Sequence, residues 1–141
     1  MNALYLDTSV LVSLHTAEAE SDAVSDWLER RPERAAISDW TTVEFASALS
    51  MKVRIGQLRL SDREHVMQTF ATFARGIIIL PVTADHFDAA VTLLARPQLA
   101  LRGPDALHLA ICADHGDHLV TRDRKLARAA LAFDVKVVVP D

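Results

Sequence analysis

The stretch ALYLDTSVLV, residues 3–12, decides how the chain begins to fold. Its first four residues are apolar and predict a short buried strand that ends at Asp7. Thr8 or Ser9 can then cap a short apolar helix that runs from Val10 to Leu14. A strand followed at once by a helix is typical of the opening of an α/β fold, provided that the rest of the chain repeats the pattern.

The rest of the chain does repeat this alternation. The run Ile77–Leu80 is apolar at every position, which is typical of a strand that helices cover on both faces. Ser61 and Glu64 are spaced as a capping box, while Thr83 and Pro104 suit the starts of two further helices. Strands are expected at 3–6, 35–38, 77–80, 118–121 and 135–139, and helices at 10–14, 18–31, 40–55, 61–74, 83–95, 104–116 and 124–131.

This order predicts an α/β protein, a three-layer α/β/α sandwich around a mostly parallel sheet. Residues 1–141 contain no internal repeat, low-complexity tract or linker, so we expect a single domain. No apolar run approaches the roughly 18 residues that a membrane helix needs. The first apolar residues follow no basic region and are interrupted by Asp7, which argues against a signal peptide. We therefore expect a cytoplasmic protein without membrane contact.

The charge of the chain leaves the class of its partner open. The formal net charge is −4, whereas nucleic-acid-binding domains usually carry a basic surface. Bound divalent cations would, however, reverse the sign of an acidic site. Most of the positive residues are arginines, whose guanidinium groups are well shaped for phosphate. The single cysteine, Cys112, lies in an apolar run and is expected to be a buried, unreactive thiol.

Several acidic residues stand at the ends of the expected elements. Asp7 and Asp123 each follow an apolar strand, and ligands of open α/β sheets bind beyond the carboxyl ends of the strands. Asp105 lies in the first turn of a helix, and Glu44 lies on the inward face of another. Spacing alone does not bring them together, because each also has an ordinary role: a helix N-terminus for Asp105 and Asp123, a turn for Asp7 and a solvated helix face for Glu44.

If these carboxylates do meet, they need cations, because like charges at short distance raise one another's pKa. Hard oxygen ligands of this kind select Mg²⁺ or Mn²⁺. Both ions serve the hydrolysis of phosphodiester bonds.

The acids lie within segments that resemble PIN-domain proteins, specifically the VapC toxins of bacterial toxin–antitoxin pairs. LDTSVLV (6–12) resembles the opening of these proteins, and the match continues through ISDWTTVEFASAL (37–49) and GQL (56–58). It returns in PDALHLA (104–110) and LVTRD (119–123). Each segment alone is a weak signal, but together they span nearly the whole chain in the family's order.

The resemblance implies a Mg²⁺- or Mn²⁺-dependent endoribonuclease, the toxin component of a toxin–antitoxin pair. The residues implied as catalytic and metal-binding are the acids Asp7, Glu44, Asp105 and Asp123, of which the last occupies the position where the family varies. Side chains implied as hydroxyl supports or phosphate contacts are Thr8, Ser9, Thr121 and Arg102. Arg122 could also touch phosphate, although surface ion pairs explain both arginines equally well.

The resemblance also implies a homodimer and a cognate antitoxin that occludes the site. An apolar helix face around Val66, Phe70 and Phe73 could serve pairing. An antitoxin arginine could neutralise the carboxylates in bidentate fashion, with its peptide lying between Trp40 and the helix of Glu44. The RNA target is not indicated.

Other interpretations are weaker. A haloacid-dehalogenase-type phosphatase would need a second aspartate where Ser9 stands, and a receiver domain would need a lysine after a strand, whereas Lys136 falls inside the last one. The serious alternative is a catalytically inactive PIN fold that binds RNA or protein, and metal-dependent cleavage of RNA would separate the two. His108 is expected to be a packed helix residue, and the tract Asp114–His118 to be a loop rather than a metal site.

Overall fold

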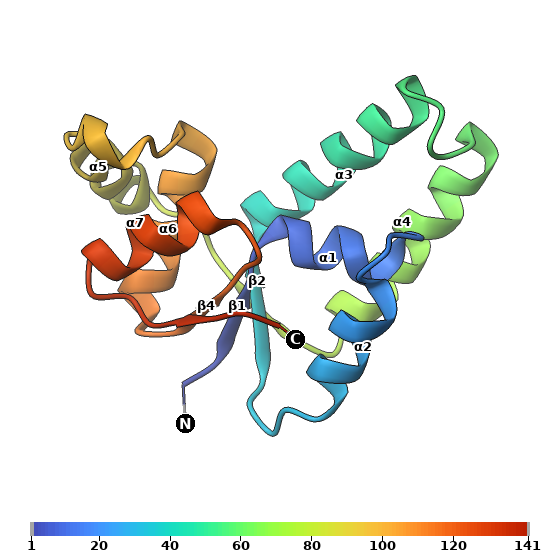
Figure 1. Ribbon diagram of the computed structural model, residues 1–141, viewed down its shortest axis with the longest axis horizontal. Coiled ribbons are helices and arrows are strands. Elements are labelled where there is room, and N and C mark those ends of the chain that lie inside the picture. Colours follow the sequence, from blue (N-terminus) through green and yellow to red (C-terminus); the bar gives the residue numbers. More distant parts are fainter. Residues whose placement is uncertain (1, 141) are drawn as a thin grey trace.

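A parallel sheet of five strands lies at the centre of the protein (Figure 1). The computed structural model describes residues 2–140. The strands lie side by side in the order β3-β2-β1-β4-β5, and every pairing between neighbours is parallel. Their bounds are β1 (Leu4–Leu6), β2 (Ala35–Ser38), β3 (Ile78–Leu80), β4 (His118–Val120) and β5 (Val137–Val138).

Helices cover both faces of the sheet, which confirms the three-layer α/β/α arrangement. Figure 1 shows the first four helices on one side of the sheet and the last three on the other. The first group is α1 (Thr8–His15), α2 (Ser21–Glu29), α3 (Asp39–Arg54) and α4 (Leu60–Ala74). The second group is α5 (Ala84–Leu93), α6 (Gly103–His115) and α7 (Arg124–Ala132), with a 3₁₀ turn, η1 (Pro97–Leu99), between α5 and α6.

The central strand β1 feeds both hydrophobic cores. Successive side chains of a strand point to opposite faces, so Leu4 and Leu6 join the core with α1–α4 while Tyr5 joins the core with α5–α7. All three side chains are buried. An apolar strand that ends at an aspartate therefore places that aspartate at the middle of the sheet edge.

The α3–α4 hairpin extends away from the sheet (Figure 1), and its base is part of the core. Phe70 on α4 is only 2% exposed and stacks on Phe45 of α3, with ring centroids 4.3 Å apart. Val66 and Phe73 pack against the same cluster. Phe70 is therefore used inside the fold, while Val66 and Phe73 are partly buried, and a role of this face in pairing stays a prediction.

Helix starts differ in detail from the sequence prediction. The first helix begins at Thr8 with Asp7 in the N-cap position, so neither Thr8 nor Ser9 is the cap. The capping box at Ser61 does not form either, because α4 begins one residue earlier, after Arg59. The cap at Thr83 is confirmed, and its backbone N–H donates to Nδ1 of His86 at 3.0 Å.

The apolar run that ends in β3 proved misleading about the position of the strand. β3 is one of the two edge strands of the sheet, and Ile79 is 42% exposed, so helices do not cover both of its faces. The run of apolar residues marks a strand but carries no information on whether the strand has one neighbour or two. Other bounds shift by a few residues, as at α2, which begins at Ser21 instead of Glu18. None of the helices described within residues 2–140 is long and apolar enough to cross a membrane.

Candidate active site

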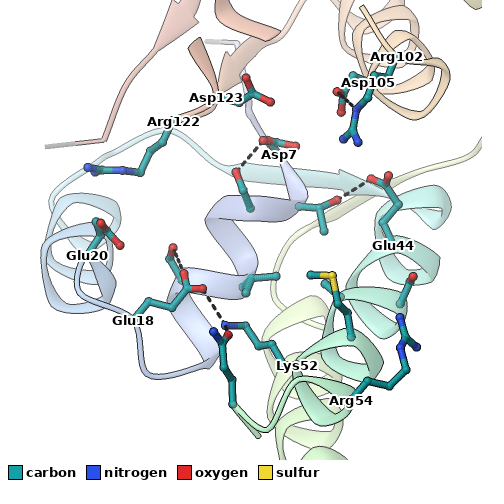
Figure 2. Close-up of a pocket in the computed structure, with 18 residues that line it drawn as sticks. Asp7, Glu18, Glu20, Glu44, Lys52, Arg54, Arg102, Asp105, Arg122 and Asp123 are labelled. Carbon is teal, nitrogen blue, oxygen red and sulfur yellow. Dashed lines mark hydrogen bonds and ion pairs between the residues drawn. The ribbon is translucent and has the colours of Figure 1, made fainter. Parts of the chain in front are cut away.

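Four acidic side chains from distant parts of the sequence line one cleft with a volume of about 810 Å³ (Figure 2). Asp7 follows β1 and Asp123 comes shortly after β4, and these two strands are parallel neighbours. Their carboxyl ends therefore lie at the same edge of the sheet. Glu44 comes from the second turn of α3 and Asp105 from the first turn of α6. The cleft thus gathers the acids that the sequence singled out.

Asp7 is the most deeply placed of these acids, with only 6% of its surface exposed. Its Oδ2 accepts hydrogen bonds from the hydroxyl groups of Ser9, at 2.7 Å, and Thr121, at 2.9 Å. Thr121 in turn accepts the backbone N–H of Asp123 at 3.0 Å. One buried hydroxyl group thereby links the ends of β1 and β4, and both hydroxyl residues lie where the resemblance implied support for the site.

Glu44 is held in a similar way by residues on the neighbouring elements. Thr8 donates to Oε1 at 2.9 Å, and Nε2 of His108 forms a short hydrogen bond with the same oxygen. Burial by itself would raise the pKa of Glu44, but its interaction with His108, the hydrogen bond from Thr8 and the charge of Arg102 outweigh this effect and lower the pKa below its ordinary value. Glu44 is consequently a carboxylate at neutral pH.

Asp105 shows the mutual repulsion of the cluster. Burial raises its pKa, and the charges of Asp7, Asp123 and Glu44 add to the rise against the opposing effect of Arg102. The Arg102 guanidinium lies 3.6 Å away and is largely exposed at the mouth of the cleft. The other three carboxylates are therefore close enough to disfavour the charge of Asp105, which is the condition under which a bound cation is stabilising.

Asp123 combines two positions. It is the N-cap of α7, where its Oδ1 accepts the backbone N–H groups of Lys125 and Leu126 at 2.9 and 3.2 Å. It also lines the cleft beside Asp7. The ordinary role that the sequence allowed for Asp123 is thus real, and it does not remove the side chain from the cluster.

The pattern of hydrogen bonds leaves room for a cation. Asp7, Glu44 and Asp123 each have one carboxylate oxygen that accepts two hydrogen bonds. The second oxygen of each has no hydrogen-bond partner within residues 2–140 of the structure. Free, fixed and hard oxygen donors on several carboxylates are the donor set that Mg²⁺ or Mn²⁺ prefers. By the chemistry of their donors the residues present therefore fit a divalent cation, although no three of these acids bring ligand atoms within 4.8 Å of one another in residues 2–140.

Positive side chains flank the acids along the cleft. Arg102 stands at one end, and Lys52 and Arg54 stand at the other, in the last turn of α3 (Figure 2). Lys52 is mostly buried and forms a 2.9 Å ion pair with Glu18. Arg122 donates to the backbone carbonyl of Pro140 at 2.7 Å, so part of its hydrogen-bonding capacity is used within the protein. Arg102 and Arg54 line the same cleft.

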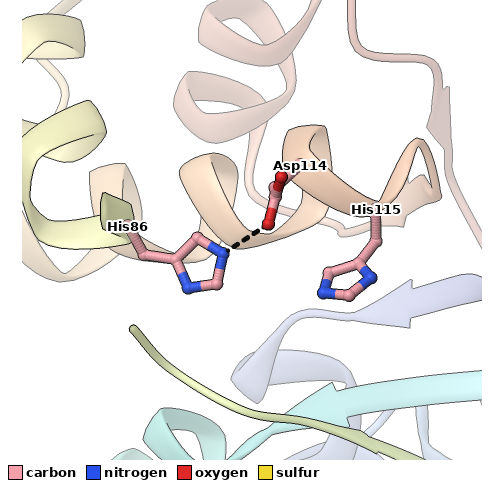
Figure 3. A group of neighbouring side chains, drawn as sticks. All are labelled: His86, Asp114 and His115. Carbon is pink, nitrogen blue, oxygen red and sulfur yellow. Dashed lines mark hydrogen bonds and ion pairs between the residues drawn. The ribbon is translucent and has the colours of Figure 1, made fainter. Parts of the chain in front are cut away.

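A second group of possible metal ligands, His86, Asp114 and His115, lies away from the cleft (Figure 3). Nδ1 of His86 accepts the backbone N–H of Thr83, so the ring proton is on Nε2, which donates to Asp114 at 2.8 Å. A metal-bound histidine normally donates a proton from its other nitrogen, and this ring has none to donate there. The group is better explained as a clip between α5 and α6.

The tract that contains Asp114 was expected to be a loop, which is wrong for most of its length. Asp114 and His115 form the last turn of α6, and His118 opens β4. Gly116 ends the helix with a φ of +66°, a conformation that favours glycine. The helix expected over 104–116 and the strand expected over 118–121 do flank this turn, so the error lies in treating the whole tract as loop.

His108 is the residue that sequence reasoning undervalued. It is fully buried, as expected of a packed helix residue, but its ring nitrogens contact Glu44 and Tyr5. Its spacing after Asp105 places it one turn further into α6, and that spacing was the available signal. Tyr5 had no such signal in the sequence, because an aromatic residue within an apolar strand is ordinarily expected to be a core residue.

The sequence and fold were compared with those of known proteins. The model of the PIN domain family matches residues 4–131. Ribonuclease VapC35 of Mycobacterium tuberculosis is 37% identical over 147 residues, which cover 97% of this chain and 96% of the relative. Among solved structures, a toxin–antitoxin complex from Klebsiella pneumoniae is 26% identical, with a TM-score of 0.67 and coverage of 99% and 98% of the two chains.

A further structure shares the fold alone. VapC20 of Mycobacterium tuberculosis, described as a sarcin-ricin loop cleaving toxin, is 17% identical with a TM-score of 0.72, covering 90% of this chain and 95% of its own. The family model spans most of the chain, and the similarity to Ribonuclease VapC35 extends over nearly all of both proteins. The chain belongs to the PIN-domain family, among the VapC ribonucleases.

Proposed function

We propose that this VapC-family ribonuclease is a divalent-metal-dependent endoribonuclease whose cleft holds Mg²⁺ or Mn²⁺ through Asp7, Glu44, Asp105 and Asp123. The observation that carries the proposal is the convergence of these four acids, from distant segments, on one cleft. The raised pKa of Asp105, which reflects burial and the other three charges, supports a site built to receive a cation.

The chemistry that such a cation supplies when bound is the activation of a water molecule and the polarisation of a phosphodiester group. The protein's own part is to hold charge in place. Ser9 and Thr121 fix Asp7 through Oδ2, and Thr8 and His108 fix Glu44 through Oε1. Fixed ligands need little reorganisation when charge develops, which is the largest contribution that a protein scaffold makes to such catalysis.

RNA is proposed to lie along the cleft across α3. Arg102 at the mouth and Arg54 further along can each contact backbone phosphates without displacing the acids. The net charge of −4 is no obstacle, since bound cations offset the acidic cluster locally.

A protein antitoxin is proposed as the partner, supported by the toxin–antitoxin complex among the similar structures. The expected groove between Trp40 and the helix of Glu44 is wrong: Trp40 lies on that same helix and packs against the other core. The cleft instead runs between α1 and α3, past Glu44 and Met51. An antitoxin segment there could place an arginine against the acids. A homodimer also remains a proposal from the family, with no face assigned.

Cleavage of RNA by the purified chain tests the proposed function. Total RNA and a sarcin–ricin stem-loop would be incubated with Mg²⁺ or Mn²⁺, and the new ends mapped by sequencing. We expect internal cuts that disappear with EDTA and in Asp7→Asn, while Asp88→Asn, an exposed aspartate on α5, leaves them unchanged. Cleavage that persists in EDTA would contradict metal dependence, and a folded protein that binds RNA without cutting it under any condition would favour the inactive binding module.

A further inference from the structure

A chain of buried polar groups leads from the interior of the protein to Glu44. Ser38, at the N-terminus of α3, forms a 2.9 Å hydrogen bond with the hydroxyl group of Tyr5. The same hydroxyl group lies 2.7 Å from Nδ1 of His108, and Nε2 of His108 reaches Glu44. The side chains of Tyr5, Ser38 and His108 are all fully buried. Burying three polar groups in a row is costly unless each is satisfied, as these are.

The carboxylate at the end of the chain sets the direction of its hydrogen bonds. An ionised Glu44 only accepts, so Nε2 of His108 must donate to it. Burial raises the pKa of Tyr5 far above its ordinary value, so Tyr5 keeps its proton and can donate it to Nδ1 of His108. Ser38 then donates to the oxygen of Tyr5. In this arrangement each of the three buried groups donates a hydrogen bond to the next, and the Glu44 carboxylate accepts the last one.

The result at Glu44 is an asymmetric carboxylate. Thr8 and His108 both bind Oε1, and Oε2 has no hydrogen bond within residues 2–140. Glu44 is partly exposed to the cleft, where a free glutamate would sample several rotamers. Two donors on one oxygen remove that freedom and leave the other oxygen for a ligand.

We propose that His108, itself held by Tyr5, is a positioning residue that fixes Glu44 with Oε2 available to the cation. This inference rests on the proposed function, since it needs Glu44 to be a metal ligand. It assigns to a buried tyrosine and a buried histidine, outside the set of acids, a role in metal affinity. Partners behind a ligating carboxylate typically change metal affinity by about 10- to 100-fold when removed.

Isothermal titration calorimetry with Mn²⁺ in the absence of RNA measures the metal affinity on which this role should act. We expect His108→Leu to weaken Mn²⁺ binding by about 10- to 100-fold. His108→Gln should restore most of the affinity, because its amide N–H₂ can reach the place of Nε2. Tyr5→Phe should lie between, since it keeps the histidine but removes the group that orients it.

The dependence of kcat on Mn²⁺ concentration is a second measurement, and a purely structural role of His108 would not change it. In His108→Leu, kcat at low Mn²⁺ should fall and recover at high Mn²⁺, while KM for RNA stays unchanged, because mass action restores the missing cation. His86→Gln is the matched control: His86 is also buried and hydrogen-bonded through both ring nitrogens, but it lies away from the cleft. It should lower the melting temperature without changing Mn²⁺ affinity.

Each outcome of this series decides the inference. Wild-type Mn²⁺ affinity in His108→Leu, or equal losses in His108→Leu and His86→Gln, would overturn it. If His108→Leu does not fold, wild-type affinity in Tyr5→Phe overturns it instead. Glu44→Gln separates the two levels of proposal: if Glu44→Gln loses Mn²⁺ and the His108 variants do not, only the positioning role fails. If Glu44→Gln binds Mn²⁺ normally, the ligand set of the proposed function fails as well.

Discussion

Thr121→Val is the most informative single change to the site, because one buried hydroxyl group joins two of the proposed ligands. Thr121 is 0% exposed, donates to Oδ2 of Asp7 at 2.9 Å and accepts the backbone N–H of Asp123 at 3.0 Å. Valine has the same shape, so the change removes both hydrogen bonds without leaving a cavity. It also leaves Asp7 with Ser9 as its one remaining side-chain donor among the described residues.

The size of the effect follows from the two bonds. A hydrogen bond to a charged group contributes about 1.5–3 kcal/mol, and an orphaned buried N–H costs about 1–3 kcal/mol. The N–H of Asp123 is near the surface and can partly hydrate, so we expect a loss of about 2–4 kcal/mol in the free energy of unfolding. For a chain of this length that corresponds to a fall of about 10 °C in melting temperature. Cleavage should fall about 10- to 100-fold through weaker metal binding.

Urea unfolding followed by circular dichroism in EDTA measures the stability term without the metal, and RNA cleavage in Mn²⁺ measures the functional one. Thr121→Ser is the matched control, since it keeps the hydroxyl group and loses only a buried methyl group, about 1 kcal/mol. The reasoning is refuted if Thr121→Val matches Thr121→Ser in both stability and cleavage, because the two hydrogen bonds would then contribute nothing.

Three further predictions follow from the geometry of the site and one from the family. Asp7→Asn and Glu44→Gln should each abolish cleavage with an unchanged circular dichroism spectrum. Near wild-type rates in either variant would remove that residue from the site. Asp123→Asn should weaken cleavage only partly, because asparagine can still cap α7. Asp105→Asn should abolish cleavage yet raise the melting temperature of the metal-free protein at pH 7. The pKa of Asp105 is raised in the folded protein, so the contribution of this side chain to stability is present at low pH and is lost as pH rises through that pKa. The gain in melting temperature from asparagine should therefore vanish at acidic pH. A melting temperature at or below wild type in EDTA at neutral pH would contradict this. Light scattering at tens of micromolar should give the mass of a dimer, and a monomer mass would count against the family-based proposal. Inhibition by a co-purified antitoxin should weaken as Mg²⁺ rises, because arginine and cation compete for the same carboxylates; inhibition indifferent to Mg²⁺ would show that the antitoxin does not occlude the acids.

The layered fold could be predicted from local patterns, because strands such as Leu4–Leu6 are buried on both faces and their helices are amphipathic. The order of the strands could not. Whether an apolar strand such as Ile78–Leu80 lies at the centre or the edge depends on contacts between distant segments, and the edge position of β3 leaves Ile79 exposed. Helix starts were uncertain for the same reason, as tertiary packing overrides a one-residue preference such as that of Ser61.

Asp7, Asp105 and Asp123 could be singled out because each stands at the end of an element, where neighbouring segments meet, whereas the full set with Glu44 came from the resemblance to the PIN family. What the sequence could not provide was which atoms pair. The link between Asp7 and Thr121 joins residues 114 positions apart, and the one between Tyr5 and His108 joins residues 103 apart. Asp123 illustrates the limit: the sequence allowed either a helix cap or a place in the site, and only the structure shows that one side chain has both positions.

The central position of β1 has a consequence for the timing of activity in the cell. β1 is made first, but its neighbour β4 begins at His118, so the two strands can pair only after most of the chain has been synthesised. At a ribosomal rate of about 5–20 residues per second, several seconds pass between the synthesis of Asp7 and that of Asp123. A nascent chain on the ribosome therefore has no complete proposed site while it is surrounded by messenger, transfer and ribosomal RNA. The order of the strands in the sheet therefore delays assembly of the proposed site until β4 has been synthesised.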